Sequence, residues 1–287
     1  MKAGNKIVLI IVLILQTLLA FSNSERLKFS HYTNEDGLPS SYVKSITQDQ
    51  YGFIWLATRS SVCRFDGNVF KTFQAYDKEG LAYDIWCNKF YITTDSVLIA
   101  QTTENKYYTF DFELEHFDPF AQINNLGVVS GLEVSNDGIW IFGEDKLHFL
   151  DKRTNEIVDG KEKINFSFLN EYTQILNLKE KDEHVVALTN TNSLFILNKR
   201  NNQQREFTLP NDLVAENVTI FYLDSHNNVW IGEVSKGLYR INLANGFSTR
   251  FSSKQTGKNR LLHNLVHSIN EDLLGRVWLV RLCTYTK

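Results

Sequence analysis

Cysteine is scarce in this sequence, and its spacing excludes the common cysteine-based scaffolds. The three cysteines are Cys63, Cys87 and Cys283, and an odd, sparse set cannot form a disulfide framework. We expect buried free thiols, although a Cys63–Cys87 bridge would form if two strands brought them together. No Cys-x-x-Cys pair or Cys/His quartet occurs, so we expect no structural zinc.

An excess of positive charge is also missing. Lysine and arginine number 30 against 33 acidic residues, for a net charge of −3. A dedicated nucleic-acid binder normally carries a basic footprint, so we expect no nucleic-acid partner. Proline and methionine are rare, whereas aromatic residues make up 13% of the chain, and this aromatic richness favours strands over helices.

Long apolar runs are absent after the N-terminus. Lys2 and Lys6 precede an apolar run over residues 7–15 that continues through residues 18–21, with small residues at Ser22 and Ser24. This pattern predicts a cleaved secretory signal over residues 1–24, periplasmic localisation, and contact with a membrane only through that segment. The alternative is a retained anchor, although residues 7–21 are shorter than the ~20 apolar residues that a span needs.

Catalytic motifs are missing too. No two glycines lie two positions apart, so no Gly-x-Gly phosphate loop exists, and no Gly-x-Ser-x-Gly elbow occurs. His263 and His267 have the spacing of a helical metal pair, but Asn264 stands where a zinc protease needs Glu, and the segment is typical of a strand. We therefore expect no metal, no cofactor and no enzymatic activity.

A repeated motif is present instead. An Asp, a turn and a Trp recur as Asp49-Gln-Tyr-Gly52-Phe-Ile-Trp55, as Asp224 to Trp230, and as Asp272-Leu-Leu-Gly275-Arg-Val-Trp278. A shortened copy ends at Trp140, and weaker copies place Leu98 and Val186 at the Trp position, so the repeat recurs every 42 to 48 residues. This is the spacing of propeller blades. The Asp residues are expected to cap turns and the Trp residues to pack between blades.

Each repeat divides into about four strands, which predicts an all-β propeller with five complete blades and an incomplete sixth. We expect one propeller domain over residues 25–287. Its blades are predicted at approximately residues 29–75, 83–120, 126–160, 170–209, 215–252 and 262–287. A linear solenoid has the same period, but radial closure leaves no long bare strand edges and is favoured.

The first repeat is similar to a known family. Phe29-Ser-His-Tyr32, Glu35-Asp-Gly-Leu-Pro39 and Gly52-Phe-Ile-Trp55 resemble the first blade of the two-component regulator propeller family, and Trp230-Ile-Gly232 with Gly237-Leu238 fits its later blades. The resemblance implies the periplasmic sensor region of a hybrid histidine kinase of Bacteroides type, with seven blades per propeller. It also implies a second propeller, a connector domain, a homodimer partner and carbohydrate signals.

The sequence departs from the family pattern at two places. Blade one has Ala57 where the family has Gly, and Ser61-Val62 where it has Gly-Leu. After Trp278 the expected Gly and Gly-Leu are missing, and neither a kinase nor an output domain is present. We therefore expect a fragment, a truncated gene or a frameshifted end.

Five residues are candidates for ligand binding because they lie in blades one and two near the loops that lead into the predicted inner strands or in the loops after the second strands. They are Tyr42, Arg59, Ser60, Tyr83 and Trp86. Rigid aromatic faces stack on sugar rings at low entropic cost. The alternative for each residue is packing between blades. The leading hypothesis is a non-catalytic periplasmic sensor of oligosaccharides. The alternatives are an exported propeller glycosidase or lyase and a protein-interaction scaffold.

Overall fold

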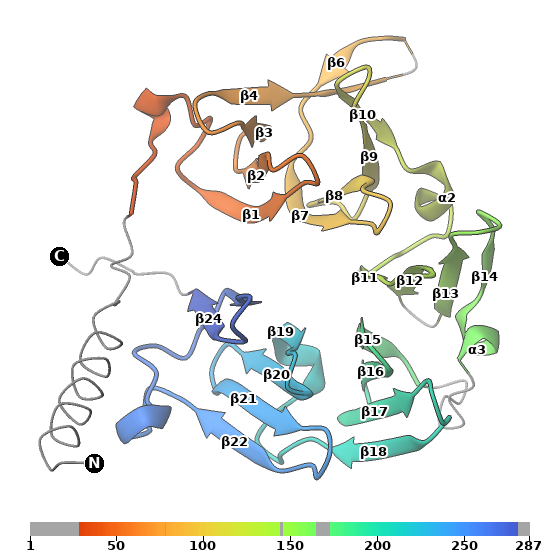
Figure 1. The fold of residues 1–287 in the computed structure, drawn as a ribbon, viewed down its shortest axis with the longest axis vertical. Coiled ribbons are helices and arrows are strands. Elements are labelled where there is room, and N and C mark those ends of the chain that lie inside the picture. The colour runs from red at the N-terminus through yellow and green to blue at the C-terminus, as the bar shows by residue number, and fades with distance from the viewer. Residues whose placement is uncertain (1–28, 78, 144–145, 165–172, 281–287) are drawn as a thin grey trace, which may run out of the picture.

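The chain folds into small sheets arranged in a ring around a common axis (Figure 1). The computed structural model describes residues 29–77, 79–143, 146–164 and 173–280. Within these ranges, five sheets have at least four strands each and a sixth has two. This β-propeller with five complete blades and an incomplete sixth confirms the predicted fold class. The expected signal segment, residues 1–24, and Cys283 lie outside the described residues.

The first three blades follow one another along the chain, and each runs from an inner strand at the axis to an outer strand at the rim. Blade 1 consists of β1 (Val43–Gln48), β2 (Ile54–Thr58), β3 (Val62–Phe65) and β4 (Phe70–Phe73). Blade 2 consists of β7 (Cys87–Ile92), β8 (Leu98–Thr102), β9 (Tyr107–Asp111) and β10 (His116–Pro119). Blade 3 consists of β11 (Gly131–Val134), β12 (Gly138–Gly143), β13 (Lys146–Asp151) and β14 (Ile157–Asp159).

The remaining blades continue the same order. Blade 4 consists of β15 (Ile175–Lys181), β16 (His184–Thr189), β17 (Ser193–Asn198) and β18 (Gln204–Thr208). Blade 5 consists of β19 (Val218–Leu223), β20 (Asn228–Glu233), β21 (Gly237–Asn242) and β22 (Ser248–Phe251). Blade 6 has β23 (Ser268–Glu271) and β24 (Val277–Val280). A short helical turn, η1 (Asn34–Asp36), precedes blade 1. Others connect successive blades from blade 2 on: α2 (Ala121–Asn124), α3 (Gly160–Lys163), η2 (Ala215–Asn217) and η3 (Gly257–Asn259).

The connection between blades 1 and 2 contains a hairpin that the repeat pattern did not predict. Its strands are β5 (Ala75–Tyr76) and β6 (Ala82–Tyr83), and β5 pairs in parallel with β10, so the sheet of blade 2 has six strands. Ala75 is fully buried at this junction. The hairpin lies outside the repeated period, and its strands of two residues are too short to give an alternating pattern.

Antiparallel pairing gives the ring two different faces. The Asp turns between first and second strands lie on the same face as the turns between third and fourth strands, and we call this the turn face. The opposite face, which we call the loop face, carries the connections into the inner strands and the loops between second and third strands. On the loop face, Arg59 N–H donates to the Tyr42 carbonyl at 3.0 Å in blade 1, and Thr103 N–H donates to the Trp86 carbonyl at 2.9 Å in blade 2.

The strand register identifies the true Trp position in each blade. Trp55 pairs with Thr47, Trp140 with Glu133 and Trp230 with Tyr222. Val186 occupies the same position, because it pairs with Lys179 and packs toward blade 5. The expectation for Leu98 was wrong by one residue. The equivalent residue is Ile99, which pairs with Tyr91 and packs toward blade 3, whereas Leu98 packs toward blade 1. An apolar pair without a Trp gives no signal that distinguishes its two members.

Hydrophobic side chains fill the interfaces between neighbouring blades. The interface of blades 1 and 2 contains Trp55 and Phe117, both fully buried, with Phe73 and Phe110 packed against the Trp55 ring. Corresponding clusters join each later blade to the next. Sheet-on-sheet packing around the ring is therefore the main stabilising interaction of the fold.

No described blade lies between β24 and β1, so blades 1 and 6 each have one open side (Figure 1). The N-terminal segment covers part of blade 1 there. The Tyr32 ring lies 5.0 Å from that of Phe65 and 5.7 Å from that of Phe70, and Leu38 is only 5% exposed. Two residues of the segments that resemble the family, Tyr32 and Leu38, therefore cover part of this sheet face.

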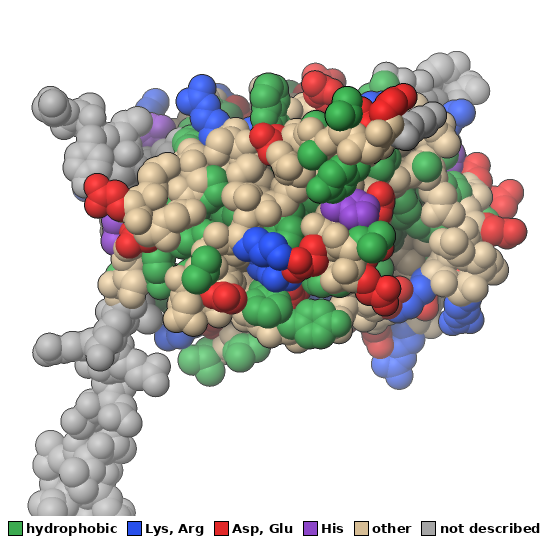
Figure 2. Space-filling model, turned by 90° about the horizontal axis from the view of Figure 1, so that it is seen from above, with side chains coloured by type: hydrophobic (Ala, Val, Ile, Leu, Met, Phe, Trp, Pro, Cys, Tyr) green, Lys and Arg blue, Asp and Glu red, His purple; other side chains and the backbone are tan. Residues whose placement is uncertain are grey.

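Acidic and basic side chains are interspersed over the side of the ring drawn in Figure 2, with isolated hydrophobic side chains between them. One ion-paired group lies on blades 1 and 2, where Arg64 and Lys71 both contact Glu115. This side offers no continuous basic surface.

Candidate functional site

The repeated Asp residues are engaged in their own turns. In blades 1, 5 and 6 the indole N–H donates to the Asp Oδ2 at 2.8 Å, in the pairs Trp55–Asp49, Trp230–Asp224 and Trp278–Asp272. The other carboxylate oxygen accepts backbone N–H groups of the turn in all three blades. Gly52 and Gly275 have φ values of +86° and +73°, a backbone conformation that glycine adopts without strain.

In blade 3, the Trp indole N–H donates to a residue of the neighbouring blade and not to a turn Asp. Its shortened turn leaves Val134 six positions before Trp140, so no Asp is available there. The Trp140 indole N–H donates instead to Glu180 of blade 4 at 2.5 Å. Glu133 of blade 3 accepts the Glu180 backbone N–H at 3.2 Å, so the two glutamates link the blades reciprocally.

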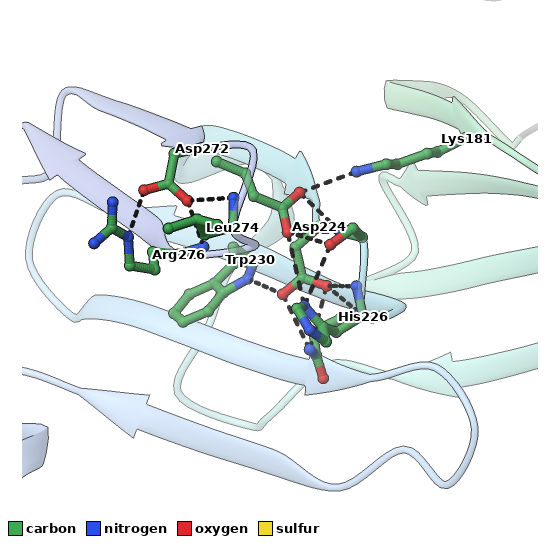
Figure 3. A network of polar contacts seen from close by, with 10 residues as sticks. Lys181, Asp224, His226, Trp230, Asp272, Leu274 and Arg276 are labelled. Atoms are coloured by element: carbon green, nitrogen blue, oxygen red, sulfur yellow. Dashed lines mark hydrogen bonds and ion pairs between the residues drawn. The ribbon is translucent and has the colours of Figure 1, made fainter. Parts of the chain in front are cut away.

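A second polar network joins blades 4, 5 and 6 on the turn face (Figure 3). Glu271 accepts a hydrogen bond from Lys181 at 3.1 Å and from the Ser225 backbone N–H at 2.9 Å, and His226 Nδ1 lies 3.7 Å away. Desolvation opposes ionisation of this carboxyl, but the hydrogen bonds from Ser225 and Lys181 lower the pKa of Glu271 overall. These groups satisfy one another, which is typical of a structural network.

A different kind of site lies on the loop face of blade 2. A hollow of about 230 Å³ is bounded by the end of the β5–β6 hairpin, the connection into β7 and the loop between β8 and β9. The residues that line it are Tyr83, Asp84, Ile85, Trp86, Thr102, Thr103, Glu104, Lys106 and Tyr108. Trp86 is 60% exposed, unlike the buried Trp55, Trp140 and Trp230, so its ring is available to a ligand.

The two tyrosines of the hollow are held in a fixed relation. The Tyr83 hydroxyl donates to the Tyr108 hydroxyl at 3.4 Å, with ring centroids 6.4 Å apart in an edge-to-face arrangement. Desolvation by burial raises the pKa of Tyr108. Tyr108 therefore remains a neutral hydroxyl that can donate a hydrogen bond. The hairpin is what places Tyr83 here, because Tyr83 pairs with Ala75.

The structure divides the five predicted ligand residues into two groups. Tyr83 and Trp86 line one hollow. Tyr42, Arg59 and Ser60 lie at the corresponding end of blade 1, where Ser60 Oγ is 3.4 Å from Thr58 Oγ1, and they do not line that hollow. Tyr42 is 51% exposed and has the same position in blade 1 that Trp86 has in blade 2.

Sequence reasoning missed most of the polar lining of the hollow. Glu104, Lys106 and Tyr108 were not selected, although the loops after second strands were expected to bear ligands. The Thr-Glu-Asn-Lys run over residues 103–106 resembles any polar turn. The hairpin, which contributes Tyr83 to the hollow, lies outside the repeated period and gave no signal for this loop.

The remaining chemistry of the described residues is sparse. Cys63 and Cys87 are buried and unpaired, as expected, and burial raises the pKa of both thiols to about 12. Among the residues that the structure describes, no group of three His, Cys, Asp or Glu side chains is placed to hold a metal ion. No helix in the described ranges is long and apolar enough to cross a membrane.

Fold and turn motif together define a propeller built from Asp–Trp repeats. Residues 37–60 match the model of the two component regulator propeller. This stretch contains the Asp49 turn and Trp55, so the family resemblance of the first repeat is confirmed. No curated protein sequence matches the chain.

Several solved structures have a similar fold. The extracellular domain of BT3049 from B. thetaiotaomicron, named as a hybrid two component system, is 20% identical over 87% of this chain and 40% of its own, with a TM-score of 0.59. That of BT4673 from the same organism, named as a one component system, is 15% identical over 87% of this chain and 33% of its own, with a TM-score of 0.58. PorZ of Porphyromonas gingivalis, a surface component of the type-IX secretion system, is 12% identical over 72% of this chain and 28% of its own, with a TM-score of 0.50. The chain spans 40% or less of each of these structures.

Proposed function

We propose that this chain is a ligand-sensing propeller of an exported two-component signalling protein and that the hollow in blade 2 binds a carbohydrate. The match of residues 37–60 and the similarity to extracellular domains of B. thetaiotaomicron signalling proteins support the sensor role. They also favour periplasmic localisation, as does the apolar segment within residues 1–24. In this proposal the kinase, a second propeller and a homodimer partner are contributed outside residues 29–280.

The exposed Trp86 is the single observation that carries the carbohydrate proposal. Three of the five Trp residues are packed between blades, whereas Trp86 lies at a hollow beside Tyr83 and Tyr108. An aromatic face with surrounding hydrogen-bonding groups is the general chemistry of sugar recognition. A volume of about 230 Å³ suits one sugar ring, so a longer oligosaccharide would extend across the loop face.

A non-catalytic role fits the repeated Asp residues, because their oxygens are occupied by turn N–H groups and indole N–H groups. The competing proposal is a glycosidase, for which Asp84 and Glu104 in the hollow supply the two carboxylates that such an enzyme needs. Incubation of the purified chain with oligosaccharides distinguishes the two. We expect binding without any release of reducing ends, and turnover abolished by Glu104→Gln would establish the enzyme instead.

The binding experiment is a calorimetric titration of the purified chain with a panel of neutral, amine-bearing and acidic oligosaccharides. Trp86→Ala should weaken binding by at least about tenfold, because truncating a central aromatic contact costs more than about 1 kcal/mol of binding free energy. Tyr51→Ala, at a 63% exposed aromatic residue on the opposite, turn face of blade 1, is the matched control and should leave affinity within about twofold. Equal losses in both variants, or no binding by any oligosaccharide in the panel, would overturn the proposal.

A further inference from the structure

The charges of the hollow are unbalanced. Asp84 and Glu104 contribute two carboxylates, and Lys106 contributes one ammonium group. No ion pair is found for these three side chains in the described part of the chain. Asp84 accepts one hydrogen bond, from Gln74 Nε2 to its Oδ1 at 3.0 Å. The excess negative charge is therefore available to whatever occupies the hollow.

The glutamates that lie between blades are arranged differently. Glu133, Glu180 and Glu271 are each paired with a lysine. On the rim, Glu115 contacts Arg64 and Lys71. A carboxylate that is left without a cation at a hollow can accept hydrogen bonds from the hydroxyl groups of a ligand, and it repels a ligand that is itself an anion.

The hydrogen-bonding groups complement these carboxylates. The Tyr83 and Tyr108 hydroxyls share one hydrogen bond, which leaves one of their two protons for a ligand oxygen. Thr102 Oγ1 accepts the Lys106 backbone N–H at 3.1 Å, so its proton is also free to be donated. The hollow thus presents acceptors for ligand hydroxyl or ammonium groups, together with donors for ring and hydroxyl oxygens.

We propose that the hollow takes one uncharged or amine-bearing sugar ring and discriminates against rings that carry a carboxylate or sulfate. This inference rests on the proposed function for the identity of the ligand, but its electrostatic part does not. Asp84 and Glu104 are the residues that determine the selectivity, and Trp86 contributes the stacking surface.

The first test compares three tetrasaccharides of equal length: a β-1,4-linked glucosamine, its neutral N-acetyl form and an oligogalacturonate. We expect the purified chain, at low ionic strength, to bind the first two about tenfold more tightly than the uronate, because the uronate carboxylates approach the exposed Asp84 and Glu104. Glu104→Gln and Asp84→Asn should each narrow this ratio severalfold. Glu113→Gln, an exposed glutamate in the turn-face loop of the same blade, is the control and should leave the ratio unchanged.

The second test needs no sugar. Fluorescence quenching by caesium and by iodide is measured on the chain and on Trp86→Phe, and the difference gives the quenching of Trp86 alone. A net negative hollow predicts that caesium quenches Trp86 more strongly than iodide and that Glu104→Gln reverses or abolishes this preference. Stronger quenching by iodide, or tighter binding of the uronate, would overturn the charge inference. Caesium preference without binding of any tetrasaccharide would overturn the proposed function and leave the charge inference intact.

Discussion

Trp55 in blade 1 and Trp278 in blade 6 occupy the same position of the repeat, and both indole N–H groups donate to an Asp at 2.8 Å. Their surroundings differ, because Trp55 is fully buried against blade 2 whereas Trp278 is 45% exposed on the open side of the ring. The turn geometry is therefore set within each blade, and burial depends on the neighbour. A blade is a local unit that gains most of its stability from the next one.

Substitution of these two Trp residues should give the largest difference between the stability that comes from packing against the next blade and the stability that comes from the turn itself. Trp55→Ala removes a fully buried ring and leaves a cavity between blades 1 and 2, so it should lower the free energy of unfolding by about 3–5 kcal/mol. Trp278→Ala should cost about 1 kcal/mol, because little packing is lost at an exposed site. Urea denaturation followed by far-UV circular dichroism measures both. Equal losses would show that the Asp–Trp hydrogen bond, and not packing, dominates.

Substitution of the Asp residues tests the turn hydrogen bonds, which blades 1, 5 and 6 share. Asp224 is 3% exposed and its oxygens accept the Trp230 indole N–H and two backbone N–H groups. Asp224→Ala should reduce stability by about 1–3 kcal/mol, since buried donors lose their acceptor. Asp272→Ala, in the solvent-exposed turn of blade 6, should cost less. The comparison uses the same denaturation curves, and a larger loss for Asp272 would contradict it.

Removing a contact of the N-terminal segment with the open side of blade 1 should reduce stability by a smaller amount. Leu38 is almost fully buried beside Leu56 and Cys63. Leu38→Ala should cost about 2 kcal/mol, at the low end for a buried leucine because the site borders solvent and can relax. Leu262→Ala, at a side chain that is 71% exposed, is the control and should change stability by less than about 0.5 kcal/mol. No loss on removing Leu38 would show that the N-terminal segment does not stabilise the blade.

The turn that Asp224 caps should lose stability only at acidic pH. Desolvation opposes ionisation of Asp224, but hydrogen bonds from Asn228 and Trp230 hold its pKa below the ordinary 3.8. Because the folded pKa is the lower one, the stabilisation is fully present above the unfolded value and is lost as pH falls through the folded value. Melting temperatures at pH 5 and at pH 3 should therefore differ less in Asp224→Asn than in the unmodified chain. An identical acid dependence would contradict this assignment.

The repeats could be predicted from the sequence because the Asp, the turn glycine and the Trp each mark a fixed point of a blade. In blade 2 the Trp is missing from the repeat, and there the prediction was wrong, because it assigned Leu98 and not Ile99 to the Trp position. The sequence predicted two of the residues that line the hollow, Tyr83 and Trp86. Its remaining wall could not be predicted, because it depends on a hairpin outside the period and on Tyr108, which reaches the hollow from the third strand.

The most direct test of the account is ¹⁹F NMR of the chain labelled with 5-fluorotryptophan. The five Trp residues give five resonances, and that of Trp86 is assigned by its loss in Trp86→Phe. On addition of a bound oligosaccharide, the account predicts that the Trp86 resonance moves while those of Trp55, Trp140 and Trp230 stay in place. A shift confined to Trp278, on the open side of the ring, would place the ligand elsewhere and contradict the assignment of the blade 2 hollow.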